Sequence, residues 1–97
     1  MDVTLQQVID RGRTAFQNRD YVAALADIRE VLAARPGFAD LHNLAGLCLS
    51  MLGQPESALA EFDRALALNQ GYIEAHLNRA ITLNELGRFE EGRAAFE

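Results

Sequence analysis

The sequence lacks several residue types that commonly signal a function. It has no tryptophan and no lysine, and all nine of its basic residues are arginine. The single cysteine, Cys48, excludes a disulfide within the chain, and its place between Leu47 and Leu49 is typical of a small buried hydrophobic residue. The two serines, Ser50 and Ser57, lie in no nucleophile-elbow pattern, and the seven glycines form no phosphate-binding loop. The sequence therefore predicts no catalytic residue and no cofactor.

A net positive charge and long apolar runs are also missing. The net charge is −5, whereas a phosphate backbone and an anionic membrane surface both attract a basic protein, so we expect neither nucleic acid nor membrane as a partner. No apolar run approaches the roughly 20 residues that cross a bilayer, and the first residues lack the basic flank of a secretory signal. We therefore expect a cytoplasmic protein. The all-arginine basic set, with abundant alanine, leucine and glycine, favours a GC-rich and bacterial source.

What the sequence does contain is an internal repeat of 34 residues. Small residues recur at this spacing, at Gly12, Gly46 and Ala80, and so do the glycines Gly53 and Gly87. Apolar residues at corresponding positions keep their size. The predicted units span about 5–38, 39–72 and 73–97, within one domain over 5–97.

Each unit has the pattern of two helices joined by a turn. Apolar residues recur with i, i+3, i+4 spacing, which is typical of amphipathic helices. Asp20 is placed to cap a helix, Gly53 to end one, and Pro55 to begin one. The predicted helices cover about 5–17, 21–34, 38–52 and 55–68, a fifth begins near 72 and turns at 87, and a sixth restarts at 89. The pattern predicts an all-α solenoid of antiparallel helix pairs, with the small residues where helices cross closely.

This pattern resembles the tetratricopeptide repeat family over essentially the whole chain. In that family a large residue precedes a Leu-Gly pair, an aromatic residue, an alanine, a second aromatic residue and a proline. The second unit carries the pattern at His42, Ala45, Gly46, Leu49, Ala58, Phe62 and Gln70. The resemblance implies a protein–protein interaction module, without enzymatic activity, whose first helices line a concave surface that holds a protein or peptide partner.

Two arginines and two histidines need a separate interpretation. Arg11 and Arg79 stand where the family prefers leucine, and we expect each to pair with a carboxylate of its own chain, Asp63 or Glu61 in the case of Arg79; gripping a partner's carboxylate is the alternative. His42 and His76 lie at equivalent positions, where two imidazoles are able to approach one ion. We favour hydrogen bonding to backbone or carboxylate groups, and predict no metal site.

The family's concave face, carried over position by position, gives a predicted peptide-binding groove. Its members are Gln6, Ile9, Arg13, Phe16, Asp40, Asn43, Leu47, Ser50, Glu74, Leu77, Asn78, Ile81 and Asn84. The apolar members have no evident place in the core, although packing against neighbouring helices is the alternative for Phe16 and Ile81. The asparagines are suited to hydrogen-bond an extended peptide.

Some family members bind the C-terminal carboxylates of heat-shock chaperones with a basic clamp, which this sequence lacks. The clamp positions fall on Ile9, Arg13, Leu44, Glu74 and Asn78. Only one of these is basic and one is acidic, so this face is expected to repel such a peptide. We expect instead an extended or amphipathic helical segment with apolar anchors and a basic residue near Asp40 and Glu74.

The third unit is shorter than the other two. A complete unit would extend to about residue 106, one period beyond the second. We expect an apolar flank to face water there, formed by Leu83, Leu86, Phe89 and Phe96. A piece of a larger protein is the favoured interpretation, and self-association through this flank, as a homodimer or a larger scaffold, is the alternative.

Overall fold

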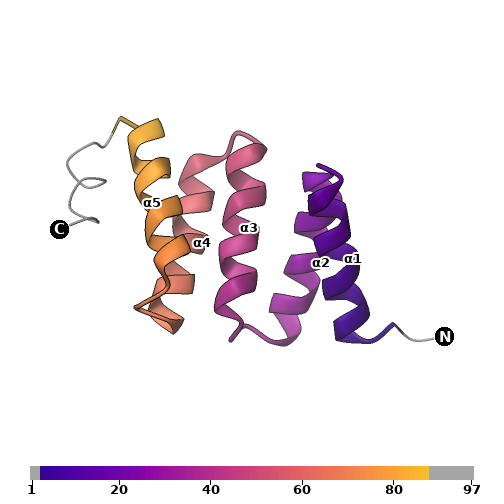
Figure 1. Cartoon of the computed structure of the whole chain (residues 1–97). Coiled ribbons are helices and arrows are strands. Elements are labelled where there is room, and N and C mark those ends of the chain that lie inside the picture. Colours follow the sequence, from indigo (N-terminus) through magenta and orange to yellow (C-terminus); the bar gives the residue numbers. More distant parts are fainter. Residues whose placement is uncertain (1–2, 88–97) are drawn as a thin grey trace.

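The computed structural model describes residues 3–87, which form helices and turns without any strand. Its helices are α1 (Leu5–Gln17), α2 (Tyr21–Ala34), α3 (Ala39–Met51), α4 (Pro55–Leu68) and α5 (Ile73–Glu85). Successive first helices begin 34 residues apart (39 − 5 = 34; 73 − 39 = 34), as do the second helices (55 − 21 = 34). The helices pair into antiparallel hairpins that stack along one direction (Figure 1), which confirms the predicted all-α solenoid. The predicted sixth helix lies outside the described residues.

Local side chains help to determine where α1, α2 and α4 begin. Thr4 and Gln7 form a capping box at the start of α1, in which each side chain accepts a hydrogen bond from the other residue's backbone N–H. The Asp20 carboxylate accepts a hydrogen bond from the backbone N–H of Ala23, so the predicted cap of α2 is confirmed. Pro55 occupies the first turn of α4, where a helix needs no N–H donor.

Helices α1 and α3 end in the same left-handed turn. In each, the residue after the C-cap has a positive φ, 62° at Arg19 and 75° at Gly53. The backbone N–H groups of Arg19 and Asp20 donate to the carbonyls of Phe16 and Ala15, which closes a Schellman motif. The two turns therefore share a geometry although only the second has the residue type that favours it.

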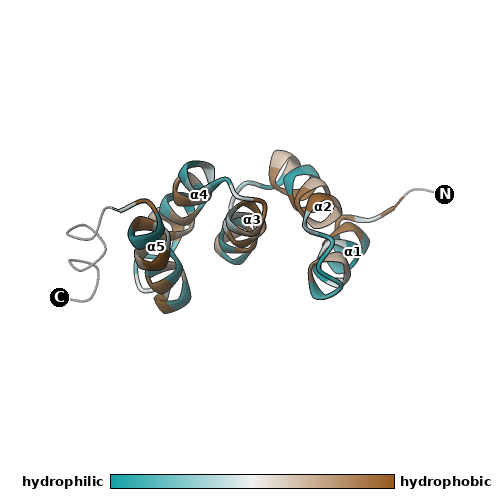
Figure 2. Cartoon of the chain, turned by 90° about the horizontal axis from the view of Figure 1, so that it is seen from above, coloured by the Kyte–Doolittle hydropathy of each residue, from teal (hydrophilic) through white to brown (hydrophobic). Residues whose placement is uncertain are grey.

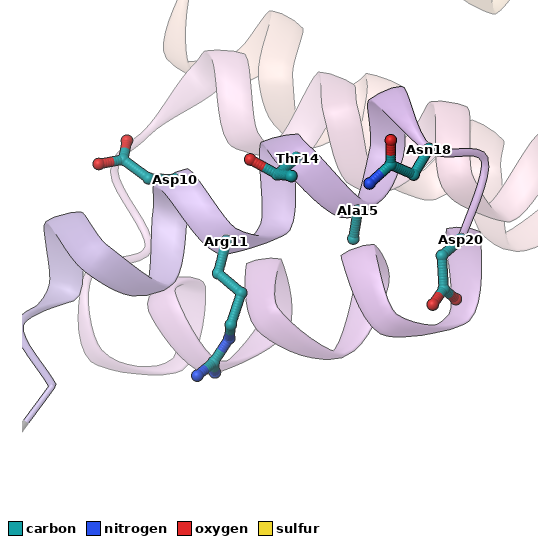
Figure 3. A pocket seen from close by; sticks show the side chains of 6 residues that line it. All are labelled: Asp10, Arg11, Thr14, Ala15, Asn18 and Asp20. Atoms are coloured by element: carbon teal, nitrogen blue, oxygen red, sulfur yellow. The ribbon is translucent and has the colours of Figure 1, made fainter.

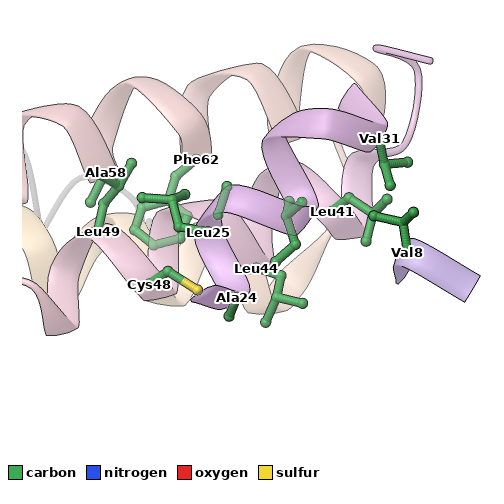
Figure 4. Close-up of a cluster of buried hydrophobic side chains, with 12 residues drawn as sticks. Val8, Ala24, Leu25, Val31, Leu41, Leu44, Cys48, Leu49, Ala58 and Phe62 are labelled. Atoms are coloured by element: carbon green, nitrogen blue, oxygen red, sulfur yellow. The ribbon is translucent and has the colours of Figure 1, made fainter. Parts of the chain in front are cut away.

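The core depends on small residues that let large ones approach. Phe62 of α4 is fully buried against Gly46 of α3, where an added Cβ would lie 2.4 Å from the ring. Ala24 and Ala58 are also fully buried, as expected for positions where helices cross closely. Figure 4 shows these side chains within one cluster that runs through the first four helices.

The middle helix contributes more residues to this core than any other helix. Eight of the 13 residues of α3 are buried, against two of 13 in α1. Helix α3 packs on both α2 and α4, and α4 packs in turn on α5. Seen from above, α1, α3 and α5 lie along one side of the array and α2 and α4 along the other, with α3 set back between its two neighbours (Figure 2). Among residues 3–87, none of the helices has both the length and the apolar character that crossing a membrane requires.

Candidate functional site

The arginines at the family's leucine positions are held by carboxylates of the same chain. Arg11 donates to both carboxylate oxygens of Asp27, with Nε–Oδ2 at 3.0 Å and Nη2–Oδ1 at 2.7 Å. This hydrogen bond and the charge of Asp27 raise the pKa of the Arg11 guanidinium. Arg79 donates to Asp63 over 2.7 Å, which confirms intramolecular pairing and Asp63 as the partner. Arg11 thus links α1 to α2, and Arg79 links α5 to α4, so each ion pair stabilises the packing of two neighbouring helices.

The histidines also have a structural role. His42 is 7% exposed, and its Nε2 lies 2.8 Å from the carbonyl oxygen of Pro36 while its Nδ1 lies 2.8 Å from Oε2 of Glu61. His76 repeats the first contact, with Nε2 2.7 Å from the carbonyl oxygen of Gln70. Each histidine thus ties the start of a first helix to the preceding turn, which confirms the expected hydrogen bonding to backbone and carboxylate groups.

The structure places the predicted groove residues along the first helices with different degrees of exposure. Leu77 and Ile81 of α5 are 44% and 47% exposed, so they are apolar side chains that the described core does not use. Leu47 and Ile9 are partly buried against the core cluster. Phe16 is also partly buried and packs edge-to-face on Tyr21 of α2, with ring centroids 5.6 Å apart, so the alternative of intramolecular packing applies to it. The polar members are exposed or half-buried except Asn43.

Asn43 differs from the other groove residues because it is only 4% exposed. Its Oδ1 accepts a hydrogen bond of 3.0 Å from Nδ2 of Asn78, which joins α3 to α5. Its side chain also interacts with the Tyr72 hydroxyl and lowers the pKa of that group. We infer that Asn43 positions its neighbours rather than offering its oxygen to a peptide backbone.

An ion pair that the sequence did not reveal joins the first two repeats. Nη2 of Arg13 lies 2.8 Å from Oδ2 of Asp40, although 27 residues separate the two along the chain. Both belong to the predicted groove, but nothing in the sequence pairs them, because their contact depends on how one hairpin is rotated against the next. Both side chains stay about half exposed, so the pair remains accessible to solvent.

The predicted apolar flank of the third unit requires a correction. Leu83 is fully buried and Leu86 is half-buried. The prediction that Leu83 faces water is therefore wrong. The reason is that Leu83 occupies the inward side of α5, one period after the buried Leu49. Phe89 and Phe96 lie outside the described residues, so self-association through these two stays a prediction.

Two further candidates offer little chemistry. Cys48 is fully buried, and desolvation raises the pKa of its thiol to about 11, which disfavours the nucleophilic thiolate. An open hollow of about 440 Å³ lies on a face of α1 away from the groove (Figure 3). It is lined by Asp10, Arg11, Thr14, Ala15, Asn18 and Asp20. Within residues 3–87, no group of three or more His, Cys, Asp and Glu side chains is placed to hold a metal ion.

Comparison with known proteins agrees with this architecture. Residues 9–73 and 52–97 match the family described as tetratricopeptide repeat. The solved structure described as MamA AMB-1 is 26% identical, with a TM-score of 0.89, over 96% of this chain and 51% of that one. A second, MamA MSR-1, is 25% identical with a TM-score of 0.90, over 96% of this chain and 53% of that one. This chain thus spans about half the length of both.

A third similar structure contains a ligand. It is described as the first TPR of Spaghetti (RPAP3) bound to the HSP90 peptide SRMEEVD, and it shares 21% identity with a TM-score of 0.90 over 95% of this chain and 73% of that one. At this identity the likeness concerns the fold alone. Among curated proteins, none matches the chain by sequence.

Proposed function

Because the chain belongs to the tetratricopeptide repeat family, we propose that it is a protein-interaction module that binds an extended or amphipathic helical peptide on the concave side of α1, α3 and α5. The observation that carries this proposal is the exposure of Leu77 and Ile81, 44% and 47%, on one face of α5. Exposed apolar side chains that lie side by side mark interaction surfaces when the core does not need them. The proposal assigns the chain binding rather than catalysis.

The remaining groove residues support a peptide-sized site. Leu47 of α3 and Ile9 of α1 lie at positions equivalent to Ile81 and Leu77 (81 − 47 = 34; 77 − 9 = 68, two periods). The same face of each first helix thus carries apolar side chains, with polar residues before and after them. Such a stripe suits a segment whose apolar residues are spaced along one side.

The partner proposed for this chain differs from the peptide in the RPAP3 structure, which has the acidic ending EEVD. Glu74, at one of the clamp positions, lies in the first turn of α5, and Asp40 lies in the first turn of α3, whereas a clamp for carboxylates needs basic groups. We therefore propose that this chain does not bind acidic chaperone tails.

A selection with phage-displayed random 16-residue peptides tests the proposal. The wild-type chain is the bait, and each selected peptide is titrated against the double variant Leu77→Asp, Ile81→Asp. We expect the dissociation constant to rise by about 30-fold or more, which corresponds to about 2 kcal/mol for the loss of central apolar contacts.

A matched double variant controls for charge and folding. Val22→Asp, Leu68→Asp also replaces two exposed apolar residues, 68% and 49% exposed, but on the second helices α2 and α4. It should bind selected peptides as the wild type does, and circular dichroism should show that both variants are folded. Selected peptides that bind the groove variant and the wild type equally would refute the proposal, as would a selection that yields no binder.

A further inference from the structure

A small hollow lies where the first repeat meets the second, on the groove side. It has a volume of about 220 Å³ and is lined by Gln6, Ile9, Arg13, Phe38, Asp40 and Leu41. Leu41 is buried, Ile9 is half-buried and Phe38 is 38% exposed, so the hollow has an apolar floor. Its edge is polar, since it carries the Arg13–Asp40 ion pair. A hollow of this size admits one long side chain.

The charges around this hollow and the neighbouring turn are unbalanced. Asp40 and Glu74 lie in the first turns of α3 and α5, one period apart, and Arg13 is the basic groove residue beside them. The pKa of the Tyr72 hydroxyl responds to these charges. Desolvation raises it, the charges of Glu74 and Asp40 raise it further, and the charge of Arg13 lowers it by a smaller amount than either carboxylate raises it. Of the charged groove residues, two are acidic and one is basic, so their net charge is negative.

The acidic edge and the apolar stripe are neighbours on the same helices. In α5, Glu74 lies one turn before Leu77 and two turns before Ile81, on one helical face. In α3, Asp40 precedes Leu47 by two turns on the equivalent face. Because the first helices are parallel, the acidic positions form one edge of the groove and the apolar positions form its middle.

We propose that the groove binds a cationic amphipathic segment, with apolar residues in the middle of the groove and arginine or lysine side chains along the edge formed by Asp40 and Glu74. This inference rests on the proposed function and adds the chemistry of the partner. One basic side chain enters the 220 Å³ hollow. Its aliphatic stem packs on Ile9 and Phe38, since long basic side chains bury the stem and keep the head in polar surroundings. Its charged head reaches Oδ1 of the Asp40 carboxylate, whose Oδ2 accepts a hydrogen bond from Arg13.

The charge at Glu74 offers a direct test of this inference. Glu74 is exposed, so Glu74→Lys reverses one charge at the edge with little change in packing. Glu30→Lys is the matched control, because Glu30 is exposed on α2 and the replacement changes the net charge equally. The probes are the synthetic forms of the groove-dependent peptides from the selection, each also made with its basic residues replaced by glutamate, and the acidic peptide SRMEEVD.

The expected result is that the selected peptides are rich in arginine or lysine beside apolar residues. Glu74→Lys should raise their dissociation constants by about tenfold or more at low salt, because like charges then face each other, and the effect should shrink as salt increases. Glu30→Lys should leave the constants within about twofold. The glutamate-substituted peptides and SRMEEVD should not bind the wild type measurably.

Other results would overturn the inference in distinguishable ways. Groove-dependent peptides that are neutral or acidic, or equal effects of Glu74→Lys and Glu30→Lys, would refute the cationic partner and leave the peptide-binding groove intact. Selected peptides that ignore Leu77→Asp, Ile81→Asp would refute the groove and this inference together. Circular dichroism of each variant ensures that a loss of binding is not a loss of folding.

Discussion

Arg19 adopts a backbone conformation that the following repeats assign to glycine. Its φ of 62° matches the 75° of Gly53 and Gly87, which lie one and two periods later. A side chain in this region costs about 1–2 kcal/mol in steric strain, whereas glycine pays only its greater entropy in the unfolded chain. We therefore expect Arg19→Gly to increase the free energy of unfolding by about 0.5–1 kcal/mol in urea denaturation.

Two variants separate backbone strain from loss of the arginine side chain. Arg19→Ala removes the side chain but keeps a Cβ in the left-handed region, so it should not stabilise the protein. Gly53→Arg introduces the strain one repeat later and should destabilise it by about 1–2 kcal/mol. Equal stabilities of Arg19→Gly and Arg19→Ala would show that strain at this turn is not the cause.

Gly46 illustrates the opposite case, in which space rather than backbone conformation requires glycine. Alanine at this helical position would gain about 1 kcal/mol in helix propensity, but its Cβ would lie 2.4 Å from the buried ring of Phe62, and overpacking typically costs about 1–3 kcal/mol. We expect Gly46→Ala to lower the free energy of unfolding by about 1–2 kcal/mol. At Gly12 the nearest atom is 3.2 Å away, so Gly12→Ala should be close to neutral. The two variants, compared by urea denaturation, would behave alike if close packing did not decide the outcome.

Among the helices, α5 depends on a polar link to the rest of the array. The Asn78–Asn43 hydrogen bond connects it to α3, and Asn43 is buried, so removing one partner leaves a buried amide without that bond. Asn78→Ala should cost about 1–3 kcal/mol, and amide hydrogen exchange should accelerate most in α5.

A double-mutant cycle assigns this cost to the link itself. Asn43→Ala, Asn78→Ala should cost less than the sum of the two single variants, with a coupling of about 1 kcal/mol. Additive effects would indicate that the two amides act independently, and uniform exchange throughout the chain would contradict a local role for the link.

The elements themselves were largely predictable from sequence, because the signals that determine them are local. Asp20, Pro55 and Gly53 act within one turn of their own positions, and the predicted bounds of α1, α2 and α4 agree with the structure. The contacts of the groove were not predictable in the same way. Arg13–Asp40 and Asn43–Asn78 join residues 27 and 35 positions apart. Both depend on the angle between successive hairpins, which helical periodicity does not specify.

The left-handed turn residues show a second limit of sequence analysis. Gly53 and Gly87 were visible as a repeated turn, but Arg19, one period earlier, gave no local signal because its side chain hides the left-handed conformation. Only the 34-residue alignment of the turns identifies it. The prediction that Leu83 is exposed was wrong for a related reason. Its equivalence to the buried Leu49 is a better guide to its burial than its distance from the last residue.

At the scale of the whole molecule, α3 in the interior of the array and α1 at its end carry different residues at equivalent positions. In α3, Leu44 and Cys48 are buried in the cluster shared with α2. The equivalent residues of α1, Asp10 and Thr14, are exposed and line the open hollow in Figure 3. Polar groups at these positions oppose the stacking of a further helix, because an unpaired polar group costs free energy when it is buried.

This contrast predicts that two substitutions are enough to make the protein self-associate through its α1 end. Asp10→Leu, Thr14→Val gives the end face the apolar character of α3, and two copies of such a face are able to pair about a twofold axis. We expect the weight-average mass in sedimentation equilibrium to rise with concentration more steeply than for the wild type. The matched control, Glu30→Leu, Ser57→Val, adds comparable apolar surface on α2 and α4 instead of at Asp10 and Thr14, and should associate less. Equal association of the two variants would mean that apolar area alone, rather than the shape of the α1 end, governs self-association.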